Sequence, residues 1–375
     1  MSPNPLIALG QLGQSPWYDF ITRDLIASGE LKRLIAEDGL RGMTSNPTIF
    51  EKAIAGSDRY DAEIRRLSAD GRSAAEIFES LALADVRSAC DAFRSHYDAE
   101  NGADGLVSIE VSPTLAQDTA RTIAEAERLW NQAARPNLMI KIPGTKAGLP
   151  AITHCIVQGI NVNVTLLFAV ERYREVIDAY LDGLEQRAAL GLPLDRIASV
   201  ASFFVSRVDA KIDPIIDRKA AESPPPRAAP LRGTAAIANA CEAYRVFEES
   251  LRTSRWDRLC AAGARPQRPL WASTSTKDPR YPDTYYVEAL VAADTVNTLP
   301  PETFAAYRDH GRPEIRIHQG IATAPAVFEA LAAAGISLAD VTRELEEEGV
   351  AKFAASYVSL LAGIETKCGA LAGTA

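Results

Sequence analysis

The sequence predicts an α/β protein built as a closed (β/α)8 barrel, with additional helices at its C-terminal end. Short apolar runs alternate with longer amphipathic stretches along most of the 375 residues, which is typical of parallel strands joined by helices. No Gly-rich turn of the GxGxxG or GxxxxGK[ST] type follows any predicted strand, so the usual nucleotide-binding feature of an open parallel sheet is missing. Polar residues instead stand near the C-terminal ends of several strands, where barrel enzymes build their active sites.

The predicted strands are short, apolar and followed in each case by an amphipathic stretch. They cover residues 39–47, 105–113, 137–145, 160–168, 197–204, 269–276 and 294–300. The stretches between them carry apolar residues at three- and four-residue spacing, which predicts helices that pack on a sheet. This repeated strand–helix order favours a parallel sheet with right-handed crossovers.

A single barrel domain is predicted to span residues 1–375. We interpret residues 1–14 as an N-terminal extension. Residues 223–233, SPPPRAAPLRG, are interpreted as a proline-rich surface loop rather than a domain linker, because a helical pattern resumes at once. Residues 338–371 predict one or two further helices.

Composition and charge narrow the class of function. A net charge of −9 and a pI near 5.2 argue against a nucleic-acid or membrane partner, where a basic excess is expected. The five cysteines are scattered and include no CxxC pair, which fits reduced thiols in a cytosolic protein. The N-terminus lacks the pattern of a signal peptide, and no apolar run approaches the roughly 20 residues of a membrane span. We therefore expect a cytoplasmic protein, which can still bind a phosphorylated metabolite through local cations.

A single lysine stands in the middle of an apolar strand. Lys141 lies in NLMIKIPGT, which reads as a strand covered on both faces. Desolvating an ammonium group costs several kcal/mol unless the group is paired or loses its proton. A buried lysine is therefore either one half of a structural ion pair or a neutral amine that can attack a carbonyl.

Polar side chains also share one face of the strand INVNVTLLF. Asn161, Asn163 and Thr165 alternate with the valines, and if the valines pack beneath the helices these three line the barrel interior. Three buried polar groups on one face suggest a polar site, because each needs a partner. A solvated face of an edge strand is the alternative.

The same alternation places Glu110 near the C-terminal mouth of the barrel. It ends the run GLVSIE, at the level where Lys141 is expected one strand away. Such a carboxylate can form a structural pair with the lysine or shuttle protons. A charge at the approach to the next helix is the simpler interpretation.

Two further polar residues follow early apolar segments. Asn46 precedes Pro47 and, taken alone, is expected to cap the next helix. Asp19 in SPWYDFITRDLI is also well placed to cap the helix that follows it. For both residues a structural role is the expectation until other evidence is added.

The ends of the strands predicted over 197–204 and 269–276 combine hydroxyls with cations. Ser202 lies near the first end, with Arg207 at the start of the next helix. A hydroxyl, a guanidinium and helix N-terminal amides together suit a phosphate, although Arg207 alone could equally be a surface residue. Ser273 and Lys277 in WASTSTKDP form a second candidate phosphate contact.

The histidines offer no metal or acyl-transfer site. His96, His154, His310 and His318 show no metal-ligand spacing and no GxSxG serine accompanies them. We expect neither a metal ion nor a cofactor.

A series of short motifs occurs in one order along the chain. After Asp19 come TSNPTIFEKAI, SIEVSP, IKIPGT, NVNVTLLF, SFFVSRVD, LRGTAAIANA and WASTSTKDP. Together they resemble the transaldolases of the longer microbial type across essentially the whole chain. The resemblance implies a (β/α)8 barrel, which agrees with the strand–helix alternation.

The resemblance also implies a covalent mechanism. Lys141 would be the Schiff-base lysine and Asp19 the acid/base at the bond that is cleaved. Glu110 would shuttle protons through a water held by Thr165. A neutral amine that adds to a ketose carbonyl loses water to give an iminium, which then acts as an electron sink.

Roles in substrate binding follow from the same resemblance. Asn46 and Asn163 would hydrogen-bond the sugar hydroxyls and the dihydroxyacetone portion, and Ser202 and Arg207 would bind the phosphate. The pattern departs at WASTSTKDP, where many shorter transaldolases place an arginine just after Ala-Ser-Phe. Lys277 is the candidate substitute, with Ser273 beside it.

The implied reaction moves dihydroxyacetone from sedoheptulose 7-phosphate to glyceraldehyde 3-phosphate in the pentose phosphate pathway. Its products are erythrose 4-phosphate and fructose 6-phosphate, and the enzyme would be a monomer or homodimer. One alternative is a lyase of the same fold that releases free dihydroxyacetone. Related aldolases carry Gln where Glu110 stands and Tyr where Phe204 stands, so both residues favour the transferase. Another alternative is a non-catalytic barrel that binds sugar phosphates.

Overall fold

The computed structural model describes residues 4–222 and 231–372, and its strands close into a parallel barrel. The predicted (β/α)8 fold is thus confirmed. In sequence order the strands are β1 (Gln14–Tyr18), β2 (Gly42–Met43), β3 (Leu106–Glu110), β4 (Leu138–Pro143), β5 (Val162–Leu167), β6 (Ser199–Phe204), β7 (Arg268–Ala272) and β8 (Thr295–Leu299). Each strand pairs with its sequence neighbour, and β1 pairs with β8 to complete the ring.

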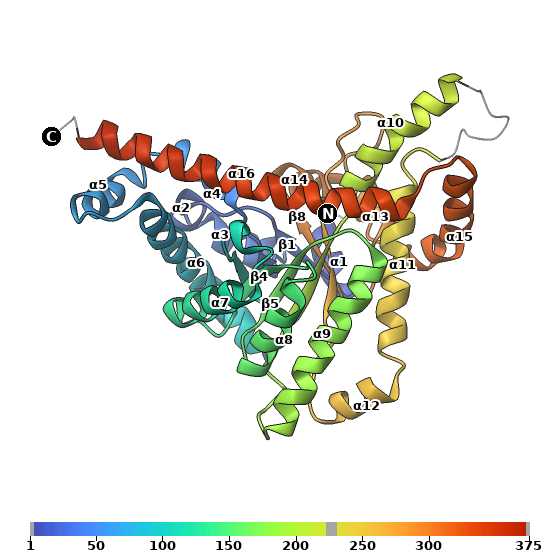
Figure 1. The fold of residues 1–375 in the computed structure, drawn as a ribbon, viewed down its shortest axis with the longest axis horizontal. Coiled ribbons are helices and arrows are strands. Elements are labelled where there is room, and N and C mark those ends of the chain that lie inside the picture. Colours follow the sequence, from blue (N-terminus) through green and yellow to red (C-terminus); the bar gives the residue numbers. More distant parts are fainter. Residues whose placement is uncertain (1–3, 223–230, 373–375) are drawn as a thin grey trace.

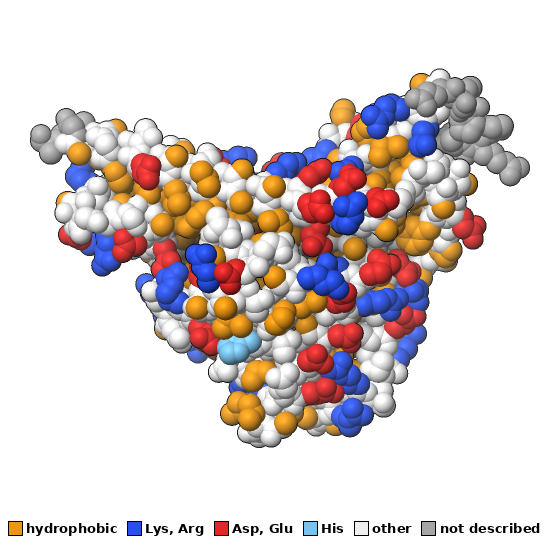
Figure 2. All heavy atoms as spheres, viewed as in Figure 1, with side chains coloured by type: hydrophobic (Ala, Val, Ile, Leu, Met, Phe, Trp, Pro, Cys, Tyr) orange, Lys and Arg blue, Asp and Glu red, His pale blue; other side chains and the backbone are white. Residues whose placement is uncertain are grey.

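Helices surround the barrel and join consecutive strands (Figure 1). The N-terminal half holds α1 (Pro5–Gln11), α2 (Arg23–Ala27), α3 (Glu30–Glu37), α4 (Pro47–Ala55), α5 (Asp61–Ala69), α6 (Ala74–Ala99), the 3-10 turn η1 (Pro113–Leu115), α7 (Thr119–Ala133), α8 (Gly148–Gln158) and α9 (Val170–Ala189). The C-terminal half holds α10 (Ser206–Glu222), α11 (Ala235–Ser250), α12 (Ser254–Ala261), α13 (Tyr285–Ala289), α14 (Pro301–His310), α15 (Ile317–Ala333) and α16 (Leu338–Ala372). On the face seen in Figure 2, acidic and basic side chains lie interspersed over these helices.

The first strand is the main element that sequence reasoning missed. β1 carries Pro16 and spans only five residues, so its pattern is weak beside the later strands. The expected N-terminal extension contains α1, whose Leu6 and Leu9 are fully buried. The strand expected over 39–47 is reduced to the two residues of β2. Most of the expected proline-rich loop, residues 223–230, lies outside the described residues.

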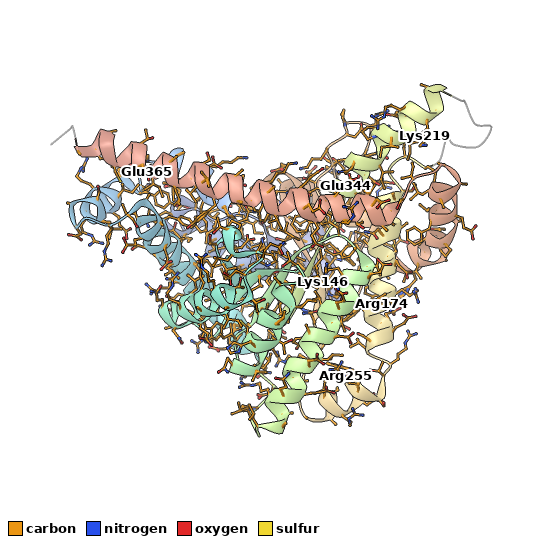
Figure 3. All side chains as sticks on the ribbon, viewed as in Figure 1. Lys146, Arg174, Lys219, Arg255, Glu344 and Glu365 are labelled. Atoms are coloured by element: carbon orange, nitrogen blue, oxygen red, sulfur yellow. The ribbon has the colours of Figure 1, made fainter. Side chains whose placement is uncertain are left out.

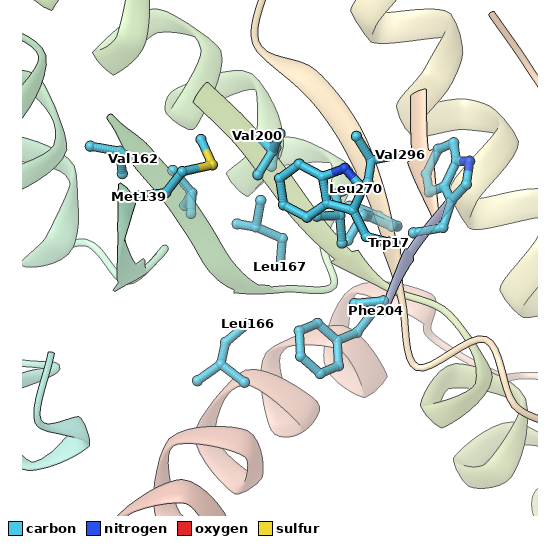
Figure 4. Close-up of a cluster of buried hydrophobic side chains, with 14 of the residues drawn as sticks. Trp17, Met139, Val162, Leu166, Leu167, Val200, Phe204, Leu270 and Val296 are labelled. Atoms are coloured by element: carbon cyan, nitrogen blue, oxygen red, sulfur yellow. The ribbon is translucent and has the colours of Figure 1, made fainter. Parts of the chain in front are cut away.

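Apolar side chains surround Trp17 inside the barrel. Trp17 is fully buried and lies in a cluster with Val200, Leu270 and Val296 (Figure 4). Its indole Nε1 donates a hydrogen bond to Asp104 at 2.9 Å. Polar side chains lie at both ends of the barrel, around Asp104 at one end and at the C-terminal ends of the strands at the other.

Helix α16 crosses the C-terminal mouth of the barrel as one long helix (Figure 1). It contacts α4, α5 and α6 on one side and α10 on the other. Among the described helices none alone is both long and apolar enough to cross a membrane. α15 and α16 meet that test only as a pair, which is bent by 91°.

We predict that Gly42→Ala destabilises the fold by about 1–3 kcal/mol, because a β-carbon at this position would overlap the indole ring of Trp17. Urea unfolding measures the change. Gly363→Ala is the matched control, since a β-carbon there meets nothing within 4 Å. In mid-helix that substitution should raise the free energy of unfolding by up to about 1 kcal/mol. A Gly42→Ala protein with the unfolding midpoint of the wild type would contradict the tight-packing argument.

Candidate active site

The strand register brings a carboxylate, an amine and an amide to one level of the barrel. Glu110 on β3 is opposite Lys141 on β4, and Lys141 is opposite Asn163 on β5. Their side chains point inward because residues on one face of a strand alternate with those on the other. The expected proximity of Glu110 and Lys141 is therefore present in the structure.

Lys141 is almost completely enclosed. The residue is 4% exposed, and its Nζ lies 3.5 Å from Oε2 of Glu110. Nζ also donates a hydrogen bond to the backbone carbonyl of Ser45 at 3.3 Å. The ring centroid of Phe353 lies 5.7 Å from Nζ. An amine so placed has Glu110 as its carboxylate partner and little access to bulk water.

Glu110 has the acidity that proton exchange near neutral pH requires. Burial raises the pKa of its carboxyl group to about 7, the charge of Lys141 opposes that rise, and Asp19 adds to it. Neither carboxyl oxygen of Glu110 has a hydrogen-bond partner among the described residues, and the same holds for the buried hydroxyl of Thr165. Buried polar atoms left free in this way are suited to contact a substrate or a water molecule.

Asp19 follows β1 and faces the cavity instead of capping a helix. The hydroxyl of Thr44 donates to Oδ1 of Asp19 at 2.7 Å and lies 2.7 Å from the hydroxyl of Thr298. Burial raises the pKa of Asp19, while Lys141 and the Thr44 hydrogen bond lower it. The expected capping role is wrong, because α2 begins after Thr22, whose hydroxyl oxygen accepts from the backbone N–H of Leu25.

Asn46 has the expected structural role and also lines the cavity. Its side-chain oxygen accepts a hydrogen bond from the backbone N–H of Ile49 at 3.0 Å, which caps α4. This contact leaves the amide nitrogen of Asn46 as the group that can meet a ligand in the cavity.

A hydrogen-bond chain crosses the barrel interior below the mouth. The amide of Asn163 donates to the hydroxyl of Ser108 at 3.0 Å and accepts from the hydroxyl of Ser202 at 2.7 Å. Ser202 was expected to bind a phosphate together with Arg207. In the structure its hydroxyl donates a hydrogen bond to Asn163. The predicted polar stack of three residues on β5 is wrong for Asn161. That amide lies at the opposite end of the barrel, where it bonds the backbone of Pro136, Leu138 and Ala198.

The cationic end of the cavity holds an arginine that the protein leaves without a carboxylate partner. Within residues 4–222 and 231–372, no hydrogen bond or ion pair engages the side chain of Arg207. Its Cζ instead lies 5.1 Å from the ring centroid of Phe204 and 5.9 Å from that of Phe353. Burial lowers its pKa against the opposing charge of Asp19. A partly buried guanidinium held by two rings is available for an incoming anion.

Two residues after β7 complete this end. The Ser273 hydroxyl lies 3.1 Å from that of Ser206 at the start of α10. Ser273 has a φ of 56°, an unfavourable backbone conformation of the kind that clusters at functional sites. Lys277 is exposed and donates to the hydroxyl of Ser275 at 2.6 Å.

One cavity of about 440 Å³ joins these groups. It is lined by eight of the ten predicted site residues, namely Asp19, Asn46, Lys141, Thr165, Ser202, Arg207, Ser273 and Lys277. The remaining two contact these residues: Glu110 pairs with Lys141, and Asn163 bonds Ser202.

Sequence reasoning did not identify Thr44, Lys52, Thr298, Glu302 and Phe353 as cavity residues. Thr44 stands directly before the Ser-Asn-Pro turn, so it could have been found there. Phe353 carried no such signal, because it is an apolar residue in a C-terminal helix that the sequence alone cannot dock.

Comparison with known proteins identifies the family. Residues 16–364 match the family described as "Transaldolase/Fructose-6-phosphate aldolase". The chain belongs to this family. A "Transaldolase" of Parafrankia sp. (strain EAN1pec) is 50% identical to it over 98% of this chain and 99% of the relative. A "Transaldolase" of Acidothermus cellulolyticus is 52% identical over 96% of both chains. The similarity first seen in short motifs therefore covers nearly the whole chain.

We predict that Glu110 makes the stability of this family member depend on pH. Because burial raises its pKa from 4.5 to about 7, the folded protein keeps this proton when the unfolded chain has already released it. Its contribution to the free energy of unfolding therefore falls as the pH rises through that window. Chemical denaturation at pH 5 and pH 8 should show a smaller pH-dependent loss in Glu110→Gln than in the wild type. Equal losses in the two proteins would contradict the assignment.

Proposed function

We propose that this chain is a transaldolase that moves a dihydroxyacetone unit from sedoheptulose 7-phosphate to glyceraldehyde 3-phosphate through a Schiff base on Lys141. The observation that carries the proposal is the enclosed amine of Lys141, 3.5 Å from a carboxylate, in the same cavity as the unpaired Arg207. The relatives named "Transaldolase" support it. The cytoplasm as the location, and a monomer or homodimer as the assembly, remain predictions from the sequence.

The first step joins the amine to the ketose. Once Glu110 takes a proton from the ammonium group of Lys141, Nζ attacks the C2 carbonyl of the ketose phosphate and forms a carbinolamine. Glu110 then returns a proton to the C2 hydroxyl, which leaves as water, and an iminium remains. A carboxyl group with a pKa of about 7 is half protonated at neutral pH and can act in both directions. Thr165, whose hydroxyl faces the cavity, is positioned to hold the water involved.

The second step breaks a carbon–carbon bond. Asp19 removes the proton of the C4 hydroxyl, the C3–C4 bonding pair moves toward the iminium, and an aldose phosphate leaves. Thr44 occupies only Oδ1 of Asp19, so Oδ2 is available for this hydroxyl. The remaining three-carbon enamine attacks the acceptor aldehyde, and the steps run in reverse. Asn46 and Asn163 are the groups proposed to orient the sugar hydroxyls.

The phosphate is proposed to bind where the positive charge is unpaired. Arg207 supplies a planar fork of N–H donors and Lys277 a second cation at the rim, with Ser273 between the two segments that carry them. Because the Ser202 hydroxyl donates its hydrogen to Asn163, its oxygen is available as an acceptor. We propose that this oxygen accepts a hydrogen bond from a sugar hydroxyl close to the phosphate.

The family description also names an aldolase that acts on fructose 6-phosphate. Such a lyase would release free dihydroxyacetone instead of transferring it. Phe204 lines the cavity, and Glu110 adjoins it through its contact with Lys141. Both residue types favour the transferase over the lyase. Measuring free dihydroxyacetone from fructose 6-phosphate in the absence of an acceptor separates the two activities, since rapid release indicates a lyase.

We predict that Lys141→Ala lowers transfer activity by at least about a thousandfold, because the variant lacks the enclosed amine that is proposed to form the Schiff base. It should also abolish the three-carbon adduct that borohydride traps on the protein, as detected by mass spectrometry. Lys146→Ala is the matched control, since this lysine is exposed and its ion-pair partner among the described residues is Glu175. Normal turnover in the Lys141 variant would refute the proposed function.

We predict that Arg207→Ala raises the KM for the ketose phosphate by about 10- to 100-fold, the loss expected for a charged hydrogen bond. The effect should be absent with unphosphorylated fructose as donor. Arg174→Ala provides the control, because this arginine is exposed and pairs with Glu249 at 3.6 Å. An equal effect on both donors would exclude Arg207 from the phosphate site.

A further inference from the structure

Helix α16 brings one aromatic side chain into the reaction cavity. Phe353 is 5% exposed, and its ring centroid lies 5.7 Å from Nζ of Lys141 and 5.9 Å from Cζ of Arg207. The steps derived above do not use this side chain. It nevertheless lies near both the nucleophile Lys141 and the guanidinium of Arg207.

Several contacts hold α16 in place over the mouth. Lys211 on α10 pairs with Glu344 at 2.7 Å and with Glu348 at 2.6 Å, both on the N-terminal side of Phe353 in α16. Figure 3 shows Glu344 on α16 where this helix passes α10. On the other side of Phe353, the hydroxyl of Thr48 on α4 donates to the hydroxyl of Ser356 at 2.9 Å. The ring is therefore fixed from both flanks of the barrel.

The strand beneath the helix is shaped to receive it. The pairing of β5 and β6 shifts register between Val164 and Leu167, and Leu166 has a φ of 60°. This conformation is costly for a branched side chain, and it turns Leu166 out of the barrel face toward α16 (Figure 4). There Leu166 packs against Gly349, where a β-carbon would lie 3.0 Å from its Cδ2. A strained residue and a glycine at this contact let the helix approach closely.

We propose that Phe353 is a specificity-determining residue that keeps the three-carbon intermediate for transfer by excluding water, as a proton donor, from the enamine carbon. The inference rests on the proposed transaldolase function. Phe353 covers the amine from the side of α16, and Phe204 continues the apolar wall beside Arg207. An apolar ring offers water no hydrogen bond, so a water molecule at this position would lose its partners.

The competing reaction shows what the ring has to prevent. Release begins when the enamine carbon takes a proton and becomes an iminium. Water then adds to the iminium carbon, a proton passes to nitrogen, and the carbon–nitrogen bond breaks. The products are free dihydroxyacetone and the original amine of Lys141. Hydrolysis of an iminium also ends the transfer reaction, so protonation of the enamine carbon is the step that separates release from transfer. Phe353 keeps water from delivering that proton on the side of α16.

The test compares two rates in each protein with fructose 6-phosphate as donor. One is the release of free dihydroxyacetone without an acceptor, and the other is transfer to erythrose 4-phosphate. Phe353→Ala should raise the ratio of release to transfer by about tenfold or more, and Phe353→Leu by a few fold, since Leu fills less of the space and has no flat face. Leu360→Ala is the control, because Leu360 is 2% exposed on the same helix but does not line the cavity. Its ratio should equal that of the wild type.

The results separate the role of Phe353 from the proposed transaldolase function. An unchanged ratio in the Phe353 variants, or an equal rise in Leu360→Ala, overturns the role of the ring while transfer by the wild type leaves the proposed function intact. Absence of transfer by the wild type overturns the proposed function, and the inference with it. Where Phe353→Ala does not fold by circular dichroism, the ratio for Phe353→Leu decides.

Discussion

The contact between Lys141 and Glu110 is the constraint on which the rest of the site depends. Two ionisable groups lie 3.5 Å apart with almost no access to solvent. The free energy of desolvating such a pair can exceed its Coulombic attraction, so its presence points to a functional role. The parallel register of β3, β4 and β5 holds the two side chains at one level. Trp17 and its apolar neighbours fill part of the barrel interior below them.

The surroundings of this pair divide the cavity into regions of different chemistry. Asp19 and Glu110 bring carboxyl groups whose pKa values burial raises. Arg207 brings a cation that two phenylalanine rings hold without neutralising it. A substrate with a carbonyl at one end and a phosphate at the other matches this separation of a nucleophile from a cation. The residues come from positions between 19 and 353 in the chain, and only the closed ring of strands, crossed by α16, brings them to one cavity.

Much of this arrangement could be predicted, and the exceptions have identifiable physical reasons. The alternation along β3 correctly placed Glu110 at the level of Lys141, because side chains in a strand repeat every two residues. Asn161 does not join the polar site, because it lies at the lower end of the barrel where backbone groups satisfy its amide. The register shift between Val164 and Leu167 is an irregularity of β5 that the sequence pattern did not reveal. Asp19 was expected to cap a helix because β1, which carries it to the mouth, has too weak a pattern to be seen.

The sequence by itself determined the barrel, the buried lysine and the polar residues at the strand ends, because these follow from periodicity and from the cost of burying charge. The tertiary structure alone decided which groups are partners. In the folded chain Ser202 bonds Asn163, and Arg207 has no carboxylate partner among the described residues. The ring of Phe353 lies near both Lys141 and Arg207. Such choices depend on how α10 and α16 dock on the barrel, and docking is set by packing between segments far apart in the chain, which local pattern does not encode.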